Sequence, residues 1–158
     1  VDIENYIILL VKQSKGHRHD TKEAKPLIKK LAKHYNPNFF YADRGYDDNE
    51  IFKLVFENLN AYPMILQKSL DVPKHRRSGL YRKLTYDTFD YGAYLQRNKI
   101  ETCNSMIKKR FGSNAKSRLC KTQKMEVAFR VIAYNIDRLI RLGDCLILIF
   151  IKIKRVSY

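Results

Sequence analysis

The sequence predicts an α/β fold, and three observations lead to this prediction. Short apolar segments rich in β-branched and aromatic residues alternate with segments that have the helical period. Acidic residues with capping spacing open two of the helical segments. The order strand, helix, strand, helix, strand implies parallel pairing, because parallel strands need a crossover connection. With 158 residues the chain is long enough for one domain with its own core.

The first elements are a strand and a helix. Residues 3–12 (IENYIILLVK) are rich in Ile, Leu and Val and predict a mostly buried strand. Asp20 and Glu23 have the capping-box spacing, so we expect Asp20 to cap a helix from about 21 to 35. Two histidines in the polar loop before it are expected to be loop residues and not ligands: His17 and His19.

A second strand, helix and strand follow. Residues 39–43 (FFYAD) predict a short strand that ends on Asp43. Asp47 and Glu50 repeat the capping spacing and open a helix that ends at about residue 59. Residues 61–66 (AYPMIL) predict the third strand.

The second half of the chain is predicted to be helical with basic connectors. Residues 67–90 show no clear period and predict a loop or insertion. A helix that starts at Tyr94 ends near Phe111-Gly112, where the glycine is a natural C-cap. A last long helix carries one apolar face. That face consists of Met125, Phe129, Ile132, Ile136 and Leu139. We expect residues 1–142 to form one domain and residues 143–158 an apolar and basic extension. Its run CLILIFI (145–151) is too short to span a bilayer and is expected to be buried or to face a partner.

The helix at 94–108 has two chemically different faces. At about 100° per residue, Tyr94, Arg97, Glu101 and Lys108 fall within a stripe about 60° wide. The opposite side is apolar and is expected to face the core: Ile100, Cys103, Met106, Ile107 and Phe111. Two interpretations of the polar stripe stay open. It is either a solvated face with i,i+4 ion pairs or a site for a metal ion and phosphate.

Asp43 is a second candidate because of its place at the end of a strand. A carboxylate at the carboxyl end of a parallel strand points into the crevice where α/β sheets usually hold ligands. The alternative is an Asp that starts a turn before Arg44-Gly45.

The charge of the chain favours a polyanionic partner. It carries 31 Lys and Arg against 16 Asp and Glu, a formal net charge of +15. A DNA-binding and an RNA-binding protein both fit this composition. Eleven Tyr and eight Phe exclude a disordered basic tail. The three cysteines lack C-x-x-C spacing, so neither a zinc site nor a disulfide framework is indicated, and we expect reduced cytosolic thiols.

The candidate residues together resemble a known family. Tyr94, Arg97, Glu101 and Lys108 are separated by two, three and six residues, which is the signature around the third acidic residue of DDE insertion-sequence transposases. The phrase ADRGY around Asp43 resembles the motif at the second acidic residue. The segments GHRHD and KKRFG also resemble parts of these transposases, so the resemblance covers most of residues 1–142.

The resemblance implies a ribonuclease-H-like mixed sheet with flanking helices, in a prokaryotic cytoplasmic, nucleoid-associated protein. It further implies metal-dependent phosphodiester cleavage and strand transfer at the ends of an insertion sequence. Asp43 and Glu101 would be catalytic residues and ligands of Mg²⁺ or Mn²⁺, two ions in the intact site. The partner would be double-stranded DNA, at the element ends and the target, with a possible homodimer. The implied DNA-binding residues are Tyr94, Arg97, Lys108, Lys109 and Arg110.

The first acidic residue of the triad has no convincing counterpart. Only about 18 residues precede the first helix, so residues 3–12 correspond to the third strand of that fold and the two strands before it are expected to be missing. Asp2 is expected to be a turn residue. The chain is therefore either the C-terminal part of a transposase core or a non-catalytic nucleic-acid-binding domain. The second class includes a decayed transposase and an unrelated RNA-binding protein.

Two basic connectors are expected to add to a phosphate-binding surface. Besides Lys109 and Arg110, their candidate members are Lys74, Arg76, Arg77, Arg82, Lys83, Lys116, Arg118 and Lys121.

Overall fold

The computed structural model describes residues 1–12, 20–68 and 71–156; of Asp20 and of residues 144–156 it describes the backbone alone. The chain divides into two compact units. The sheet unit comprises Lys12–Asn98, and the long-helix unit comprises Val1–Val11 together with Lys99–Tyr158. Each unit is described by itself.

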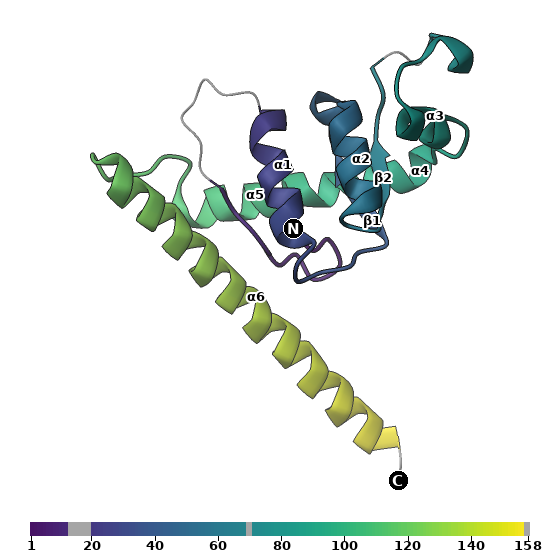
Figure 1. Cartoon of the computed structure of the whole chain (residues 1–158). Coiled ribbons are helices and arrows are strands. Elements are labelled where there is room, and N and C mark those ends of the chain that lie inside the picture. The colour runs from purple at the N-terminus through teal and green to yellow at the C-terminus, as the bar shows by residue number, and fades with distance from the viewer. Residues whose placement is uncertain (13–19, 69–70, 157–158) are drawn as a thin grey trace. The chain divides into compact units, whose positions relative to one another are not determined.

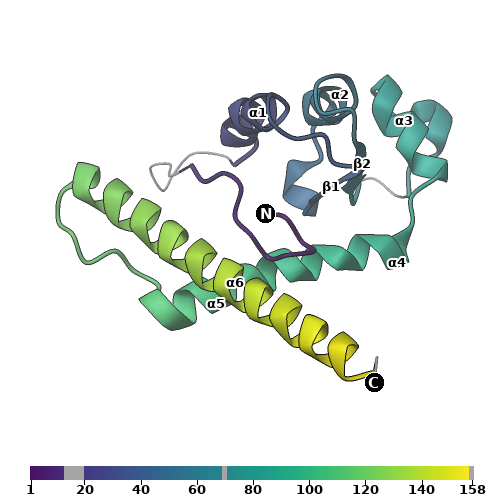
Figure 2. The same ribbon diagram turned by 90° about the horizontal axis from the view of Figure 1, so that it is seen from below.

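The sheet unit contains a β-α-β arrangement, as predicted. Strand β1 (Phe39–Ala42) and strand β2 (Tyr62–Ile65) pair in parallel, with Phe39 opposite Tyr62 and Ala42 opposite Ile65. Helix α1 (Asp20–Leu31) packs on helix α2 (Asn49–Glu57), and the two lie side by side in Figure 1. In Figure 2 they lie on one side of the strands. The core between them is formed by Ile28, Ala42, Ile51, Phe52, Leu54, Val55, Leu59, Ala61 and Ile65.

The start of α2 corrects one sequence prediction. Asp48, not Asp47, caps this helix: its Oδ1 accepts a hydrogen bond of 2.9 Å from the backbone N–H of Glu50. The difference arises because the short 3₁₀ helix η1 (Arg44–Tyr46) follows β1 and its C-cap position falls on Asp47. The Asp47 side chain is therefore free to turn inward, where only 1% of its surface is exposed.

Residues 67–90 are not the loop that the sequence predicts. They contain the 3₁₀ helix η2 (Lys74–Arg76) and helix α3 (Leu80–Asp87). The apolar pattern of α3 is misleading because Leu80 and Leu84 are exposed, whereas the polar Thr85 is buried. A helix whose buried face is polar gives no hydrophobic period, so pattern analysis misses it.

The predicted helix at 94–108 consists of consecutive segments. Helix α4 (Tyr91–Tyr94) and the 3₁₀ helix η3 (Leu95–Arg97) belong to the sheet unit and lead into helix α5 (Asn98–Phe111). Gly112 ends α5 as predicted: its φ is +84° and its N–H donates to the carbonyl oxygen of Lys108 at 2.9 Å.

The prediction of a strand at residues 3–12 is wrong. Asp2 and Ile7 form an isolated antiparallel bridge around a turn, and the following residues to Lys12 have no regular structure. Within the long-helix unit, side chains of the long C-terminal helix hold this segment. The Asn135 amide accepts from the N–H of Ile8 at 3.0 Å and donates to its carbonyl at 2.9 Å, as a neighbouring strand would.

The long C-terminal helix is α6 (Cys120–Val156), which has 37 residues and is labelled in Figure 1. The apolar face predicted for it is present, and each of its five members is more than half exposed in the structure. No described helix is both long enough and apolar enough to cross a bilayer. The expected burial of the run 145–151 lies outside the described side chains.

Candidate functional site

Asp43 occupies the position that the sequence predicts, directly after β1. Its exposed side chain caps η1, because Oδ1 accepts a hydrogen bond of 2.9 Å from the N–H of Gly45. The interpretation as a turn-starting Asp is therefore geometrically correct. It does not exclude a ligand role, since a carboxylate offers four acceptor positions and this contact uses one of them.

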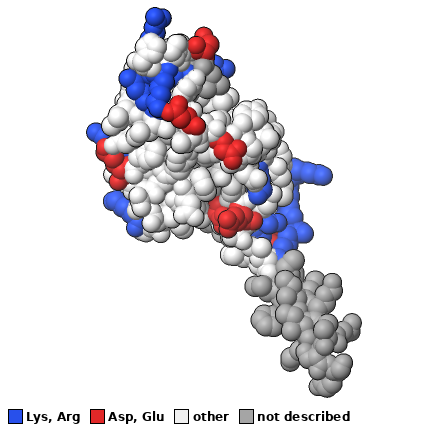
Figure 3. All heavy atoms as spheres, turned by 90° about the vertical axis from the view of Figure 1, so that its right-hand side faces the viewer, with Lys and Arg blue, Asp and Glu red and all other residues white. Residues whose placement is uncertain are grey.

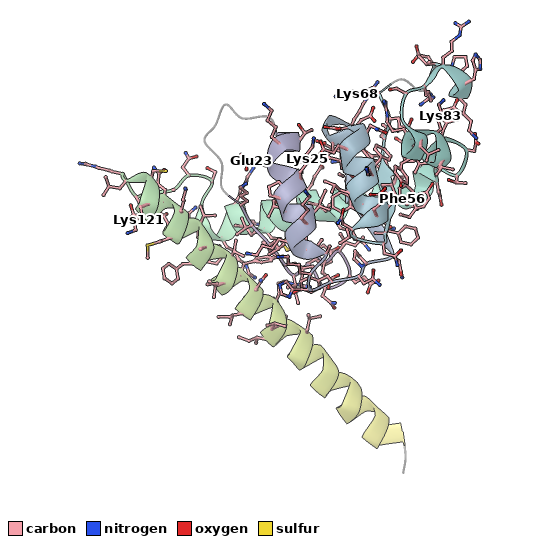
Figure 4. All side chains as sticks on the ribbon, viewed as in Figure 1. Glu23, Lys25, Phe56, Lys68, Lys83 and Lys121 are labelled. Atoms are coloured by element: carbon pink, nitrogen blue, oxygen red, sulfur yellow. The ribbon has the colours of Figure 1, made fainter. Side chains whose placement is uncertain are left out.

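The loop that carries Asp43 is fixed by Asp47. Oδ2 of Asp47 accepts from the N–H of Lys68 at 2.8 Å and from Nη2 of Arg82 at 2.9 Å. Arg44 in the same loop donates from Nη2 to the carbonyl oxygen of Lys68. The loop after β1 is thus joined to α3 and to Lys68, three residues beyond the end of β2 and labelled in Figure 4.

A buried polar network supports the other side of this sheet edge. The Nε2 of Gln67 donates to Thr85 Oγ1 at 3.0 Å, and its Oε1 accepts from Arg77 Nη1 at 2.6 Å. The guanidinium of Arg77 also lies over the ring of Tyr86, 3.9 Å from the centroid. Burial of most of these polar groups is tolerated because they bind one another, although Nη2 of Arg77 is buried without a hydrogen-bond partner among the described residues. Gln67, two residues after β2, is therefore joined to α3 and to the segment that precedes α3.

Tyr94 and Arg97 lie in the sheet unit with Asp43. Helix α4 packs against β2, and η3 packs against β1. The ring of Tyr94 is buried beside Phe89 and Tyr91, and the guanidinium carbon of Arg97 lies 5.7 Å from its centroid. The structure thus places the Tyr-Arg half of the motif against β1, which leads into the Asp43 loop, and against its partner strand β2. The role of either residue toward DNA stays a prediction.

Glu101 and the three basic candidates lie on α5 in the long-helix unit. All four are exposed, and Cys103 on the opposite face is fully buried, as predicted. Ile100 and Ile107 are half-buried, less than expected. Arg110 forms an ion pair with Asp137 of α6, whose pKa is lowered first by Arg141 and then by Arg110. Arg110 is therefore bound to α6 through this ion pair.

The two carboxylates proposed as metal ligands belong to different units of the chain. Asp43 belongs to the sheet unit and Glu101 to the long-helix unit, so their convergence stays a prediction. Among the described residues, no three His, Cys, Asp or Glu side chains gather closely enough to hold a metal ion. A two-ion mechanism needs an oxygen ligand fixed between both ions, and these donors do not provide it.

Asp2 is a turn residue, as expected. Its Oδ1 accepts from the N–H of Glu4 at 3.0 Å and its Oδ2 from the side chain of Asn5 at 2.8 Å. Partial burial acts to raise the pKa of Asp2, but these hydrogen bonds outweigh it and hold the pKa below its usual value. Both oxygens are engaged in shaping the turn.

The basic connectors are less uniform than the sequence predicts. Arg77 is buried and Arg82 is bound to Asp47, so neither belongs to an exposed phosphate-binding surface. Lys74 forms an ion pair with Asp87. Lys83 is half-buried, and the remaining members are exposed: Arg76, Lys109, Lys116, Arg118 and Lys121. On the face seen in Figure 3, basic groups alternate with acidic ones and do not form a continuous field.

Sequence reasoning missed Asp47 as a residue of the site. It assigned Asp47 to the cap of α2, and the signal available was the adjacent pair Asp47-Asp48. Two consecutive acids cannot both cap one helix, so one of them needed another role. The structure gives Asp47 that role, the attachment of the Asp43 loop to the rest of the sheet unit.

Comparison with known proteins identifies the family of the chain. A family model described as transposase DDE domain matches residues 1–136 of the 158. No curated protein and no solved structure matched the chain. The matched region contains the Asp43 loop, its supporting network and the whole of α5. The chain therefore belongs to the transposase DDE domain family.

Proposed function

We propose that this chain is part of the catalytic core of an insertion-sequence transposase and acts on double-stranded DNA. The single observation that carries the proposal is the family match over residues 1–136, which contains both motifs in the expected order. The ribonuclease-H-like fold remains part of the proposal. A parallel β-α-β unit with Asp43 after its first strand is one of the elements that such a fold requires.

DNA is held in this proposal by the exposed cations of α5 and of the connector after it. Lys108 and Lys109 on the last turn of α5 and Lys116 in the connector supply point charges for phosphates. Arg97 adds a guanidinium beside the strands. The net charge of +15 makes association with a polyanion favourable at long range, and salt weakens it.

Asp43 and Glu101 hold one divalent cation in this proposal, Mg²⁺ or Mn²⁺, with water completing the coordination. In-line attack on a phosphodiester calls for a second, fixed ion, and the sequence offers no convincing third carboxylate to hold it. We therefore expect the chain to bind DNA and to cleave it poorly or not at all. The divalent cation, the DNA ends recognised and a homodimeric assembly are all parts of the proposal.

The first experiment measures DNA binding as a function of salt concentration. A fluorescent duplex is titrated with the chain, and the logarithm of the affinity is plotted against the logarithm of the salt concentration. Each phosphate contact contributes about 0.9 to the negative slope. We expect Arg97→Ala to weaken binding and to reduce the slope by about one contact. Binding with no salt dependence would contradict the proposed DNA surface.

The second experiment measures strand cleavage with Mg²⁺ or Mn²⁺ on duplexes that carry the element ends. We expect little or no product from the unaltered chain. Efficient cleavage that disappears in Asp2→Ala would contradict the proposal, because Asp2 would then complete the triad. Efficient cleavage that survives Asp43→Asn and Glu101→Gln would contradict the assignment of these two carboxylates.

A further inference from the structure

The long-helix unit contains a surface hollow that the proposed catalytic site does not use. It has a volume of about 480 Å³ and lies between the end of α5, the connector after it and the first turns of α6. Phe111, Met125 and Phe129 form its apolar wall. A volume of this size is within the range of small-molecule sites.

The hollow is held open by a fixed polar frame. Arg130 donates from Nη1 to the carbonyl oxygen of Gly112 at 3.0 Å and from Nη2 to that of Asn114 at 2.9 Å. Glu126 accepts from the N–H groups of Lys116 and Ser117, both at 3.0 Å, and forms an ion pair with Arg130. The connector is therefore attached to α6 at both ends of the hollow, which exists before any ligand arrives.

The wall of the hollow exposes apolar surface to water. The Phe129 side chain is 64% exposed and Met125 is 51% exposed. An aromatic ring that is open on one face can stack on a planar ligand. Exposed apolar surface can mark an interaction site, and the other members of the apolar face of α6 are exposed as well.

The charge around the hollow selects the class of ligand. Between residues 108 and 124 the chain has seven Lys and Arg and no Asp or Glu. Lys121, on the first turn of α6, extends away from the ribbon in Figure 4. Glu126 lines the hollow itself, but its charge is compensated by the N–H groups of Lys116 and Ser117, the Ser117 hydroxyl and Arg130, which lower its pKa to about 2. An apolar, aromatic hollow within a cationic surface fits a planar base attached to phosphates.

We propose that this hollow binds one unpaired nucleobase of the DNA, stacked on Phe129, with flanking phosphates held by the connector cations. The inference rests on the proposed DNA function and extends it. Bases inside a duplex are stacked and paired and cannot reach a surface aromatic ring. The base must therefore come from a single-stranded end or an opened base pair.

The test compares two duplexes that differ by one nucleotide. One is blunt, and the other carries a single unpaired 2-aminopurine at one end, whose fluorescence is quenched on stacking. With the full chain we expect tighter binding of the second duplex and quenching of its fluorescence. Phe129→Ala is expected to weaken binding of that duplex by about 5- to 100-fold and to abolish quenching. Binding of the blunt duplex stays the same.

Ile136→Ala is the matched control, because Ile136 is 52% exposed on the same helix and does not line the hollow. It should retain both the preference and the quenching. Phe129→Leu keeps apolar bulk without the ring and should lose the quenching. Equal binding of both duplexes by the unaltered chain overturns the inference and leaves the proposed function intact. An apolar peptide site would give this result. Failure to bind either duplex overturns both.

Discussion

Asp47→Asn is expected to destabilise the sheet unit by removing one charge of a buried ion pair. Asp47 is 1% exposed and its partner Arg82 is 16% exposed, with 2.9 Å between Oδ2 and Nη2. Loss of one partner of a fully buried pair costs about 3–5 kcal/mol. Water still reaches part of Arg82, so we expect a loss of about 2–4 kcal/mol in the free energy of unfolding. The Asn Oδ1 can still accept from the N–H of Lys68. The loss in the free energy of unfolding therefore reports the removed charge and not a lost hydrogen bond.

The assay is urea unfolding followed by tyrosine fluorescence. With a slope of about 2 kcal/mol per molar urea, the midpoint should fall by roughly 1–2 M. Lys53→Gln is the control, because its pair with Glu57 spans 3.9 Å between side chains that are 57% and 45% exposed. An exposed pair of this kind contributes less than about 0.5 kcal/mol.

A double-mutant cycle with Arg82→Met measures the coupling directly. Once Arg82 has lost its charge, Asp47→Asn should cost less, which gives a coupling of at least about 1 kcal/mol. A midpoint for Asp47→Asn equal to that of Lys53→Gln, or a coupling of zero, would refute the reasoning. The loop that carries Asp43 would then be held by something other than this ion pair.

Three further predictions concern other parts of the chain. Gly79→Ala should lower the free energy of unfolding by about 2 kcal/mol or more, because φ is +88° and the new Cβ would lie 1.9 Å from Oδ1 of Asn49. Its control, Gly143→Ala, meets no neighbouring atom within 4 Å in α6 and should stabilise the helix, so equal urea midpoints would contradict the account. The carboxyl of Glu126 should titrate at about pH 2 and not at 4.5 in carbon-detected NMR, because the N–H of Lys116, the hydroxyl and N–H of Ser117, and Arg130 all favour its charged form. Since its folded pKa is the lower one, Glu126 contributes stability above pH 4.5, and this contribution is lost as the pH falls through about 2; titration at the ordinary value would contradict the frame of the hollow. Lys109→Ala should reduce the salt slope of DNA binding by about one contact, whereas Arg77→Ala should leave the slope unchanged and lower stability; the reverse pattern would show that the buried cation faces DNA.

The β-α-β order and the position of Asp43 could be predicted because they depend on local signals. Apolar strands, acidic caps and the glycine at 112 each act within a few residues. Helix α3 could not be predicted, since its inward face is Thr85 and its contacts are to Gln67, which pattern analysis treats as a surface residue. The segment at 3–12 has the composition of a strand, but its backbone is paired by the side chain of Asn135, far away in the sequence. Such a partner leaves no local signal.

The candidate site, too, could be predicted only in part from the sequence. The motif residues are assigned from the resemblance to transposases. The family that this resemblance suggests is confirmed, whereas the roles of the individual residues stay a prediction. Spacing gave no information on which Lys and Arg side chains are bound to partners within the protein. Arg77, Arg82 and Arg110 resemble their neighbours in the sequence, and only the positions of Gln67, Asp47 and Asp137 show that each has a structural partner.

The most direct test of the central claim asks whether Asp43 and Glu101 share one divalent cation. Fe²⁺ bound in place of Mg²⁺ generates hydroxyl radicals with ascorbate and peroxide, and these cut the backbone near the ion. We expect cuts close to both residues 43 and 101, mapped by mass spectrometry, and the loss of both sets in either Asp43→Asn or Glu101→Gln. Cuts near only one of the two residues, or cuts that survive both substitutions, would contradict a common site.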